Sequence, residues 1–226
     1  MNKTAVRNAA TLILVRDTET RPAILMGQRG ANAAFEPNKF VFPGGAVDPC
    51  DANVPLAAPM PEPCRSRLAD DILAQIAFDT LPHAIVTAAI RELWEETGLI
   101  LGQRGTWPNP PQDWADFAAT GHVPAADMLR FVFRAITPAG RPRRFDARFL
   151  MADAAHLASD PDDFSQASDE LSHLQWIPID EARRFTLPYI TEVVLAEVTA
   201  ALPHIDAPER VPFYHSNNVD KVFRRH

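Results

Sequence analysis

The stretch AAIRELWEETGLI, residues Ala88–Ile100, carries three glutamates and one arginine in a segment with the pattern of a helix. Apolar residues recur every four positions, at Ile85, Ala89 and Leu93, so one face can be buried. Gly98 is the type of residue that ends a helix in the left-handed conformation. The sequence therefore predicts a helix that ends at Thr97.

The glutamates Glu92, Glu95 and Glu96 are spaced i, i+3 and i+4, so their side chains share one face of this helix. Their mutual repulsion raises their pKa values and costs stability unless a cation neutralises them. No group of cysteines or histidines is close in the sequence, and carboxylate oxygens alone favour a hard divalent ion. We expect Mg²⁺, with Mn²⁺ as the alternative.

A solvated helix face is the other interpretation, because Arg91 and Glu95 at i, i+4 can form an exposed ion pair. Gly44 and Gly45, which follow the apolar Phe40–Phe42, favour a ligand site instead. Glycine lets the backbone approach a ligand closely. Strand, glycine loop and acidic helix are therefore expected to form one unit.

These residues resemble the signature of the Nudix hydrolases, G-x5-E-x7-R-E-U-x-E-E-x-G-U, in which U is aliphatic. Residues 91–99 match its second half at every position. In the first half, Asp51 stands where the family usually has Glu, and about thirty extra residues, near 52–82, separate loop and helix. We interpret them as an insertion, which a loop tolerates at a small cost in free energy.

A branch of the family that resembles the peroxisomal coenzyme A diphosphatase carries such an insertion. Two later segments, Thr137–Phe149 (TPAGRPRRFDARF) and Leu174–Ala182 (LQWIPIDEA), are similar to that branch. The resemblance then runs from Thr11 to Glu197, and it implies one Nudix hydrolase domain over residues 1–226.

The resemblance also implies roles for individual residues. It implies that the metal ligands are the Gly44 carbonyl, Glu92, Glu95 and Glu96. It implies a catalytic set of Arg91, Glu92, Glu95 and Glu170. Arg91 would orient the motif by pairing with Asp51, and Glu170 lies where several family members take a general base or a further metal ligand from a late loop.

Substrate contacts are expected from three places in the sequence. Arg29 follows the second predicted strand, and Arg143 or Arg144 precedes a later one, so these arginines are candidates to pair with phosphates. Phe35, in the loop before the glycines, is a candidate to stack on a base. We take Arg29, Phe35 and Arg144 as substrate-binding candidates, with solubilising surface charge as the alternative for each arginine.

Composition limits the class of protein. With 226 residues, 46% of them hydrophobic, and a net charge of −7, the chain is expected to be soluble and to form one substantial core. Because it lacks a basic stripe, a nucleic-acid polymer is not an expected partner. The apolar run Ala9–Val15 is too short to cross a membrane. Cys50 and Cys64 are expected to be reduced thiols of a cytoplasmic protein.

Short apolar runs predict strands at Thr11–Val15, Ala23–Gln28, Phe40–Phe42, Met128–Ile136 and Phe145–Ala152. Besides the acidic helix, helices are predicted at Arg67–Phe78, Trp114–Ala119 and Pro188–Leu202. Helices beside a mixed sheet give an α/β/α sandwich, which is also the architecture implied by the Nudix resemblance. An exposed apolar face on the helix within the insertion would favour a homodimer.

The leading functional hypothesis is a Mg²⁺-dependent diphosphatase that acts on a nucleoside diphosphate derivative, with coenzyme A or an acyl derivative favoured by the branch resemblance. ADP-ribose and NADH stay open as alternative substrates. A different class is a non-catalytic module that senses or binds a nucleotide metabolite. Such modules commonly lose carboxylates of the motif, whereas this chain retains all three glutamates.

Overall fold

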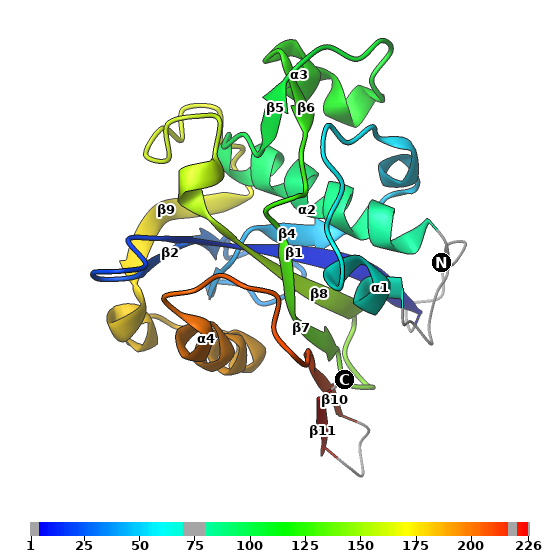
Figure 1. Cartoon of the computed structure of the whole chain (residues 1–226). Helices are drawn as coiled ribbons and strands as arrows, with labels where there is room; N and C mark the ends of the chain where they lie inside the picture. Colours follow the sequence, from blue (N-terminus) through cyan, green and yellow to red (C-terminus); the bar gives the residue numbers. More distant parts are fainter. Residues whose placement is uncertain (1–4, 70–79, 217–220, 226) are drawn as a thin grey trace.

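The computed structural model of the protein describes residues 5–69, 80–216 and 221–225 (Figure 1). In these ranges a mixed sheet has the strand order β11-β10-β7-β8-β1-β2-β3, with β4 paired to β1 and β9 to β2. β1 runs parallel to β8, and β7 parallel to β10. The strands are β1 (Val6–Arg16), β2 (Ala23–Arg29), β3 (Phe40–Val41), β4 (Gly44–Ala46), β7 (Arg130–Ile136), β8 (Arg144–Asp153), β9 (Leu171–Pro178), β10 (Pro212–Ser216) and β11 (Lys221–Arg225).

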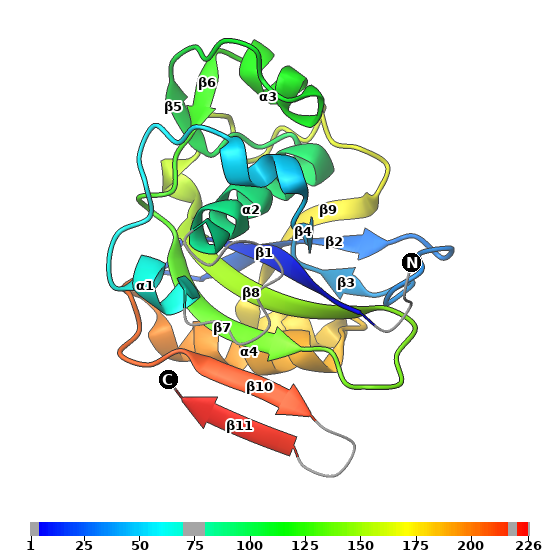
Figure 2. The same ribbon diagram turned by 90° about the vertical axis from the view of Figure 1, so that its right-hand side faces the viewer.

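Helices cover both faces of the sheet (Figure 2). Alternate residues of β1 explain this, because successive side chains of a strand point to opposite faces. Leu12 and Leu14 pack in one core with α2 (Leu81–Thr97) and α1 (Cys64–Ala69). Ile13 and Val15 pack in the other with α4 (Tyr189–Ala201). The expected α/β/α sandwich with a mixed sheet is confirmed.

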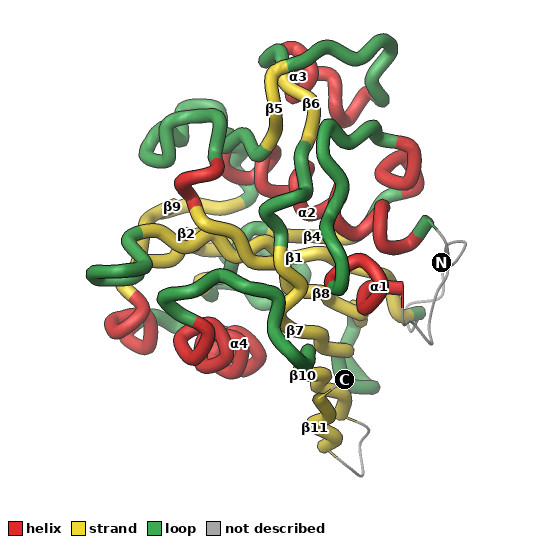
Figure 3. The backbone as a smooth tube through the Cα atoms, in the orientation of Figure 1, coloured by secondary structure: helices red, strands yellow, loops and turns green. Residues whose placement is uncertain are grey.

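A smaller unit lies beyond α2, built from β5 (Gly102–Arg104), α3 (Ala115–Ala119) and β6 (His122–Pro124) (Figure 3). β5 and β6 form a separate antiparallel pair. Phe117 of α3 is fully buried and packs edge to face on Trp94 of α2. Trp94, which lies between the glutamates, therefore contacts this unit.

The predicted strands lie within or next to β1, β2, β3, β7 and β8, and the predicted last helix is α4. The short strands β4, β5, β6, β10 and β11 were not predicted, because runs of three to five residues carry too little alternation, and the eight-residue β9 was not predicted as a strand either. Within the described part of the chain, no helix combines the length and the apolar character that a bilayer span requires.

The segment 52–82 begins beside a short 3-10 helix, Pro49–Asn53, and contains α1. The helix predicted at Arg67–Phe78 overlaps α1 at residues 67–69, and its remainder lies outside the described residues. Cys64 and Leu68 face the core. Cys50 and Cys64 are separate thiols, and the Cys64 sulfur accepts a hydrogen bond from the Phe131 amide at 3.3 Å.

Candidate active site

Helix α2 carries the glutamates and ends as predicted. Gly98 has a φ of 75°, and its amide donates to the Trp94 carbonyl at 2.8 Å. Glycine adopts this left-handed conformation without the steric cost that a Cβ adds. The helix start, at Leu81, precedes the apolar stripe that the sequence singled out. The last two turns of α2 thus present the acidic residues at a defined end of the helix.

The glycine loop contacts two of these glutamates. The Gly44 amide donates to Oε2 of Glu96 at 2.8 Å. A Cβ at Gly45 would lie within about 2.5 Å of the Glu92 carboxylate carbon, and a Cβ at Gly44 would meet the Ala10 carbonyl oxygen at 2.5 Å. Gly44 therefore requires glycine, whereas a side chain at position 45 would displace the Glu92 carboxylate. The observed contact of Gly44 is through its amide, whereas the resemblance implied its carbonyl as a metal ligand.

Three carboxylates form one group. Oxygen atoms of Glu92, Glu96 and Glu170 lie within 4.8 Å of one another. Glu92 and Glu96 are buried, whereas Glu170 is exposed on the loop before β9. That loop is attached to α2, because the Ser168 amide donates to the Glu95 carbonyl at 3.0 Å. The structure therefore brings Glu170 to the helix that carries the acidic motif.

The electrostatics of this group suit a cation. Burial raises the pKa of Glu92 to about 7, with Arg91 opposing the rise and the charges of Glu95 and Glu170 adding to it. Burial and the charge of Glu92 hold the pKa of Glu96 well above its ordinary value. Oε1 of Glu96 is buried without a hydrogen-bond partner in the protein. An oxygen in that state is a suitable ligand for a hard divalent cation.

Glu95 lies outside this group of three. Its side chain is 36% exposed, and one carboxylate oxygen accepts from Nη1 of Arg91 at 3.1 Å. Burial raises the pKa of Glu95, and the charge and hydrogen bond of Arg91 oppose this rise only in part. In this structure Glu95 is a partner of Arg91, whereas the resemblance implied a direct metal ligand.

Arg91 is held by Asp51 in a buried two-point ion pair. Nε and Nη2 of Arg91 donate to the two Asp51 oxygens, each at 3.0 Å, and Asp51 is fully buried. The short 3-10 helix brings Asp51 close enough, since the Asp48 amide also donates to its carboxylate at 2.8 Å. The aspartate therefore makes the pairing expected of a glutamate, although its side chain is one methylene shorter.

Trp114 contributes a further donor to this ion pair. Its indole Nε1 lies 3.4 Å from Oδ1 of Asp51, and its ring packs edge to face on Phe117. This contact could not be predicted from local sequence patterns, because 63 residues separate the two partners. The small unit beyond α2 therefore contributes to holding the motif together.

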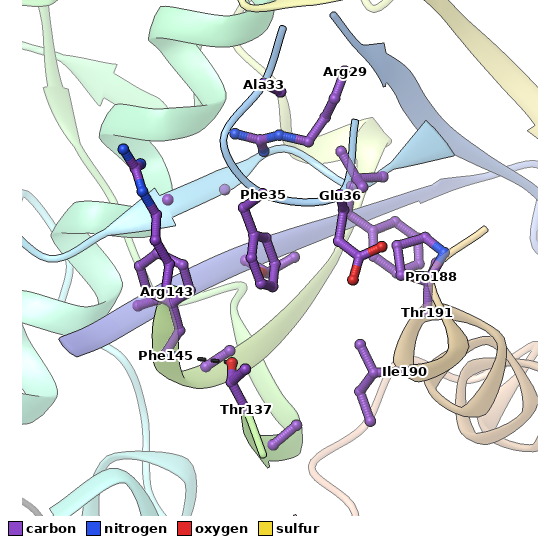
Figure 4. A pocket seen from close by; sticks show the side chains of 18 of the residues that line it. Arg29, Ala33, Phe35, Glu36, Thr137, Arg143, Phe145, Pro188, Ile190 and Thr191 are labelled. Carbon is purple, nitrogen blue, oxygen red and sulfur yellow. Dashed lines mark hydrogen bonds between the residues drawn. The ribbon is translucent and has the colours of Figure 1, made fainter. Parts of the chain in front are cut away.

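A cavity of about 570 Å³ opens beside the carboxylates (Figure 4). Arg29, Gly44, Gly45 and Glu170 line one end of it, so the cavity and the carboxylate group share Glu170. The charge of Arg29 acts on Glu96 by lowering its pKa. Phe35 is in the wall and packs edge to face on Phe145, with ring centres 5.4 Å apart. Arg29 and Phe35 thus lie where substrate contacts were expected.

The candidate Arg144 lies elsewhere. Its Nε donates to the Thr137 carbonyl at 3.1 Å, and it is not among the residues that line the cavity, whereas Arg143 is. Alternation along β8 explains the difference, because Phe145, Ala147 and Phe149 face the cavity while Asp146 and Arg148 face the opposite side. The structure therefore favours Arg143 over Arg144 as the arginine that faces the cavity.

Other residues that line the cavity were not predicted as site residues. Arg141 lies in the turn before β8, Tyr189 begins α4, and Tyr214 comes from β10. Arg141 belongs to the basic run that singled out its neighbours, so the signal was present. Tyr214 could not be found, because the pairing of β10 with β7 joins segments far apart in the sequence.

The sheet, the two helical layers and the glycine loop against the acidic end of α2 make up the Nudix fold. A crystal structure of a NUDIX hydrolase from Alicyclobacillus acidocaldarius has this fold with a TM-score of 0.63 and 25% identity, over 87% of this chain and 92% of that structure. No family model matches the chain.

A Caenorhabditis elegans protein described as nudix hydrolase 7 is 32% identical in an alignment over 200 residues that covers 80% of this chain. The chain spans 57% of that relative's own length. The chain is thus similar to Nudix hydrolases in sequence, through this relative, and in fold, through the solved structure.

Proposed function

We propose that the chain is a divalent-metal-dependent hydrolase that cleaves a diphosphate linkage in a nucleoside diphosphate derivative. The observation that carries this proposal is the group of Glu92, Glu96 and Glu170 at the end of a cavity that also holds Arg29. Like charges that are buried together need a cation, and a diphosphate needs its own charge neutralised before a nucleophile can approach. One site meets both needs.

Glu92, Glu96 and Glu170 would hold the cation, and we propose Mg²⁺, with Mn²⁺ as its substitute. When bound, the cation would neutralise charge on the diphosphate. Arg29 would pair with a phosphate oxygen. We assign the general base to Glu170, because it is the exposed member of the group and can accept a proton from the attacking water. Arg91 and Glu95 complete the proposed catalytic set by orienting the end of α2.

Coenzyme A, free or acylated, is the substrate we favour, in line with the branch resemblance and an expected cytoplasmic location. Coenzyme A carries a third phosphate apart from its diphosphate. The cavity offers Arg141 and Arg143 in addition to Arg29, together with apolar and aromatic walls. ADP-ribose and NADH are the alternative substrates, and they would leave the additional arginines with less to bind.

A non-catalytic sensor of a nucleotide metabolite is the second candidate. The observation in its favour is the displacement of Glu95 from the carboxylate group onto Arg91. Against it, the acidic motif is complete and the buried Glu96 oxygen lacks a partner in the protein. Hydrolysis of a substrate would support the enzyme, whereas binding without hydrolysis would support the sensor.

The test is to incubate the purified protein with Mg²⁺ and each of coenzyme A, acetyl-coenzyme A, ADP-ribose and NADH, and to identify the products by mass spectrometry. Cleavage of coenzyme A should release a phosphopantetheine and an adenosine bisphosphate. Glu96→Gln keeps the shape of the side chain but removes its charge, and it should abolish turnover. Binding without turnover of any compound by the wild-type protein would favour the sensor.

A further inference from the structure

Arg67 of α1 joins the segment 52–82 to the C-terminal part of the chain. Its Nη1 donates to the Pro208 carbonyl, and its Nη2 donates to the Glu209 carbonyl at 2.9 Å. The two acceptors lie 141 and 142 residues further along the chain. Figure 2 shows α1 beside the segment that leads into β10. One guanidinium thus binds two consecutive carbonyls just before that strand.

The helix that carries Arg67 is itself fixed to the core. Cys64 and Leu68 are fully buried, and the Cys64 sulfur accepts from the Phe131 amide at the start of β7. Val211, two residues after Glu209, is buried in the same core cluster. Arg67 therefore has a rigid base from which it can position the backbone of residues 208–209.

The strand that follows supplies part of the cavity wall. β10 pairs parallel with β7, and Tyr214 lies opposite Ala135 in that register. Both residues line the cavity, and the Tyr214 ring contacts Tyr189 with ring centres 6.1 Å apart. Figure 4 shows Thr137 and Ile190 of this region at the end of the cavity away from Arg29. Tyr214 therefore belongs to the part of the cavity wall that β7 and β10 form beside Thr137.

We propose that Arg67 is a positioning residue for substrate binding, which holds β10 so that Tyr214 closes the far end of the cavity. The kinetic part of this inference rests on the proposed function. Through Arg67 and β10, α1 then affects the binding of the part of the substrate that does not react. Loss of the two hydrogen bonds should weaken substrate binding and leave the chemical step intact, since the carboxylates lie at the other end.

The experiment compares Arg67→Ala with Arg65→Ala in the full chain. Arg65 is on the same helix, is exposed, and pairs only locally with Glu62, so its removal changes charge equally without touching residues 208–209. For Arg67→Ala we expect KM for coenzyme A to rise about tenfold with kcat within about twofold. Arg65→Ala should keep both values. Arg67→Lys, which can donate to one carbonyl at a time, should lie in between.

Hydrogen exchange gives a readout that needs no turnover. In Arg67→Ala the amides of β10 should exchange about tenfold faster, while those of β8 should keep their wild-type rates. Unchanged exchange in β10 would overturn the inference even if the wild-type protein hydrolyses no diphosphate. If the wild-type protein lacks turnover but exchange in β10 becomes faster in Arg67→Ala, the proposed function is contradicted. The role of Arg67 in holding β10 is then still supported.

A double substitution tests whether Arg67 acts through Tyr214. In a Tyr214→Ala background, Arg67→Ala should raise KM by less than twofold, because the wall that it positions is already absent. A full tenfold rise in that background would contradict the role of Tyr214. A fall in kcat with unchanged KM would contradict the role in binding.

Discussion

At the scale of single residues, Asp51 shows how a departure from the family pattern is accommodated. The side chain is shorter than glutamate, yet it accepts from Arg91, the Asp48 amide and the Trp114 indole in a fully buried position. Because the buried carboxylate accepts from all of these donors, a side chain of another length would not keep the same contacts. The short 3-10 helix brings this aspartate within reach of Arg91, so we expect a glutamate to fit the site less well.

Asp51→Glu should therefore destabilise the protein, by about 1–3 kcal/mol, because an extra methylene has to fit into a packed site. Asp51→Asn should cost more, about 3–5 kcal/mol, since it breaks the buried two-point ion pair and leaves Arg91 hydrogen-bonded only to the carboxylates of Glu92 and Glu95. Urea unfolding followed by tryptophan fluorescence measures both. A glutamate variant as stable as the wild type would contradict this account of the site.

The pair Arg143 and Arg144 gives a second prediction at this scale. Arg143→Ala should raise KM for coenzyme A about tenfold, because its side chain lines the cavity. Arg144→Ala should leave KM unchanged, because its guanidinium binds the Thr137 carbonyl. Steady-state kinetics of the two neighbours decides the matter, and equal effects on KM would refute the assignment.

At the scale of elements, α2 and β4 form a pair that tolerates little change. Gly45→Ala would insert a methyl group where the Glu92 carboxylate lies. We expect turnover to fall at least about tenfold, with weaker Mg²⁺ activation, because Glu92 has to move. Gly30→Ala is the matched control, since a Cβ there has nothing within 4 Å. Titration of activity with Mg²⁺ compares the two, and equal activation curves would argue against the contact.

The same helix predicts a pH dependence for the metal-free protein. Burial raises the folded-state pKa of Glu92 from 4.5 to about 7, so between these values the folded state binds more protons than the unfolded state. The stabilisation is present below pH 4.5 and is lost as the pH rises to about 7. Thermal unfolding in EDTA should show this loss, and Glu92→Gln should reduce it, with the remainder due to the raised pKa of Glu96. A melting temperature that rises over this range for the wild type alone would contradict the prediction.

Elements also show how far the sequence could predict the structure. The apolar stripe of α2 and the glycine after it predicted that helix and its end, because both signals are local. β10 and its Tyr214 could not be predicted, since a five-residue strand acquires its place only by pairing with β7. Arg29 and Phe35, predicted as substrate contacts, line the cavity, whereas Arg144 does not, because the phase of alternation in β8 is set by its neighbours in the sheet.

At the scale of the whole molecule, the carboxylate group links metal binding to the stability of the fold. Glu92 and Glu96 belong to α2, which packs on the central sheet, while Glu170 belongs to the loop that enters β9. A cation bound by all three would join these parts. It would bind the folded state alone and so stabilise the entire domain.

Mg²⁺ at about a hundredfold over its Kd should therefore add about 2.7 kcal/mol, which is roughly 5–10 °C in Tm for a chain of this size. Glu96→Gln should remove this shift. In the absence of metal, the same variant should melt above the wild type, because it relieves a buried carboxylate. Differential scanning calorimetry with and without EDTA measures both effects, and a full Mg²⁺ shift in the variant would refute the ligand assignment.

The alternation of β8 has an evolutionary consequence. One face of this strand carries Phe145 and Ala147 toward the cavity, while the other carries Asp146 and Arg148 into a buried ionic network with Arg134. Insertion of one residue inside β8 would exchange these faces, burying the wrong side chains on both sides of the sheet. Natural variation in length should therefore accumulate in the turn at 138–143, where new substrate preferences can arise without disturbing the strand.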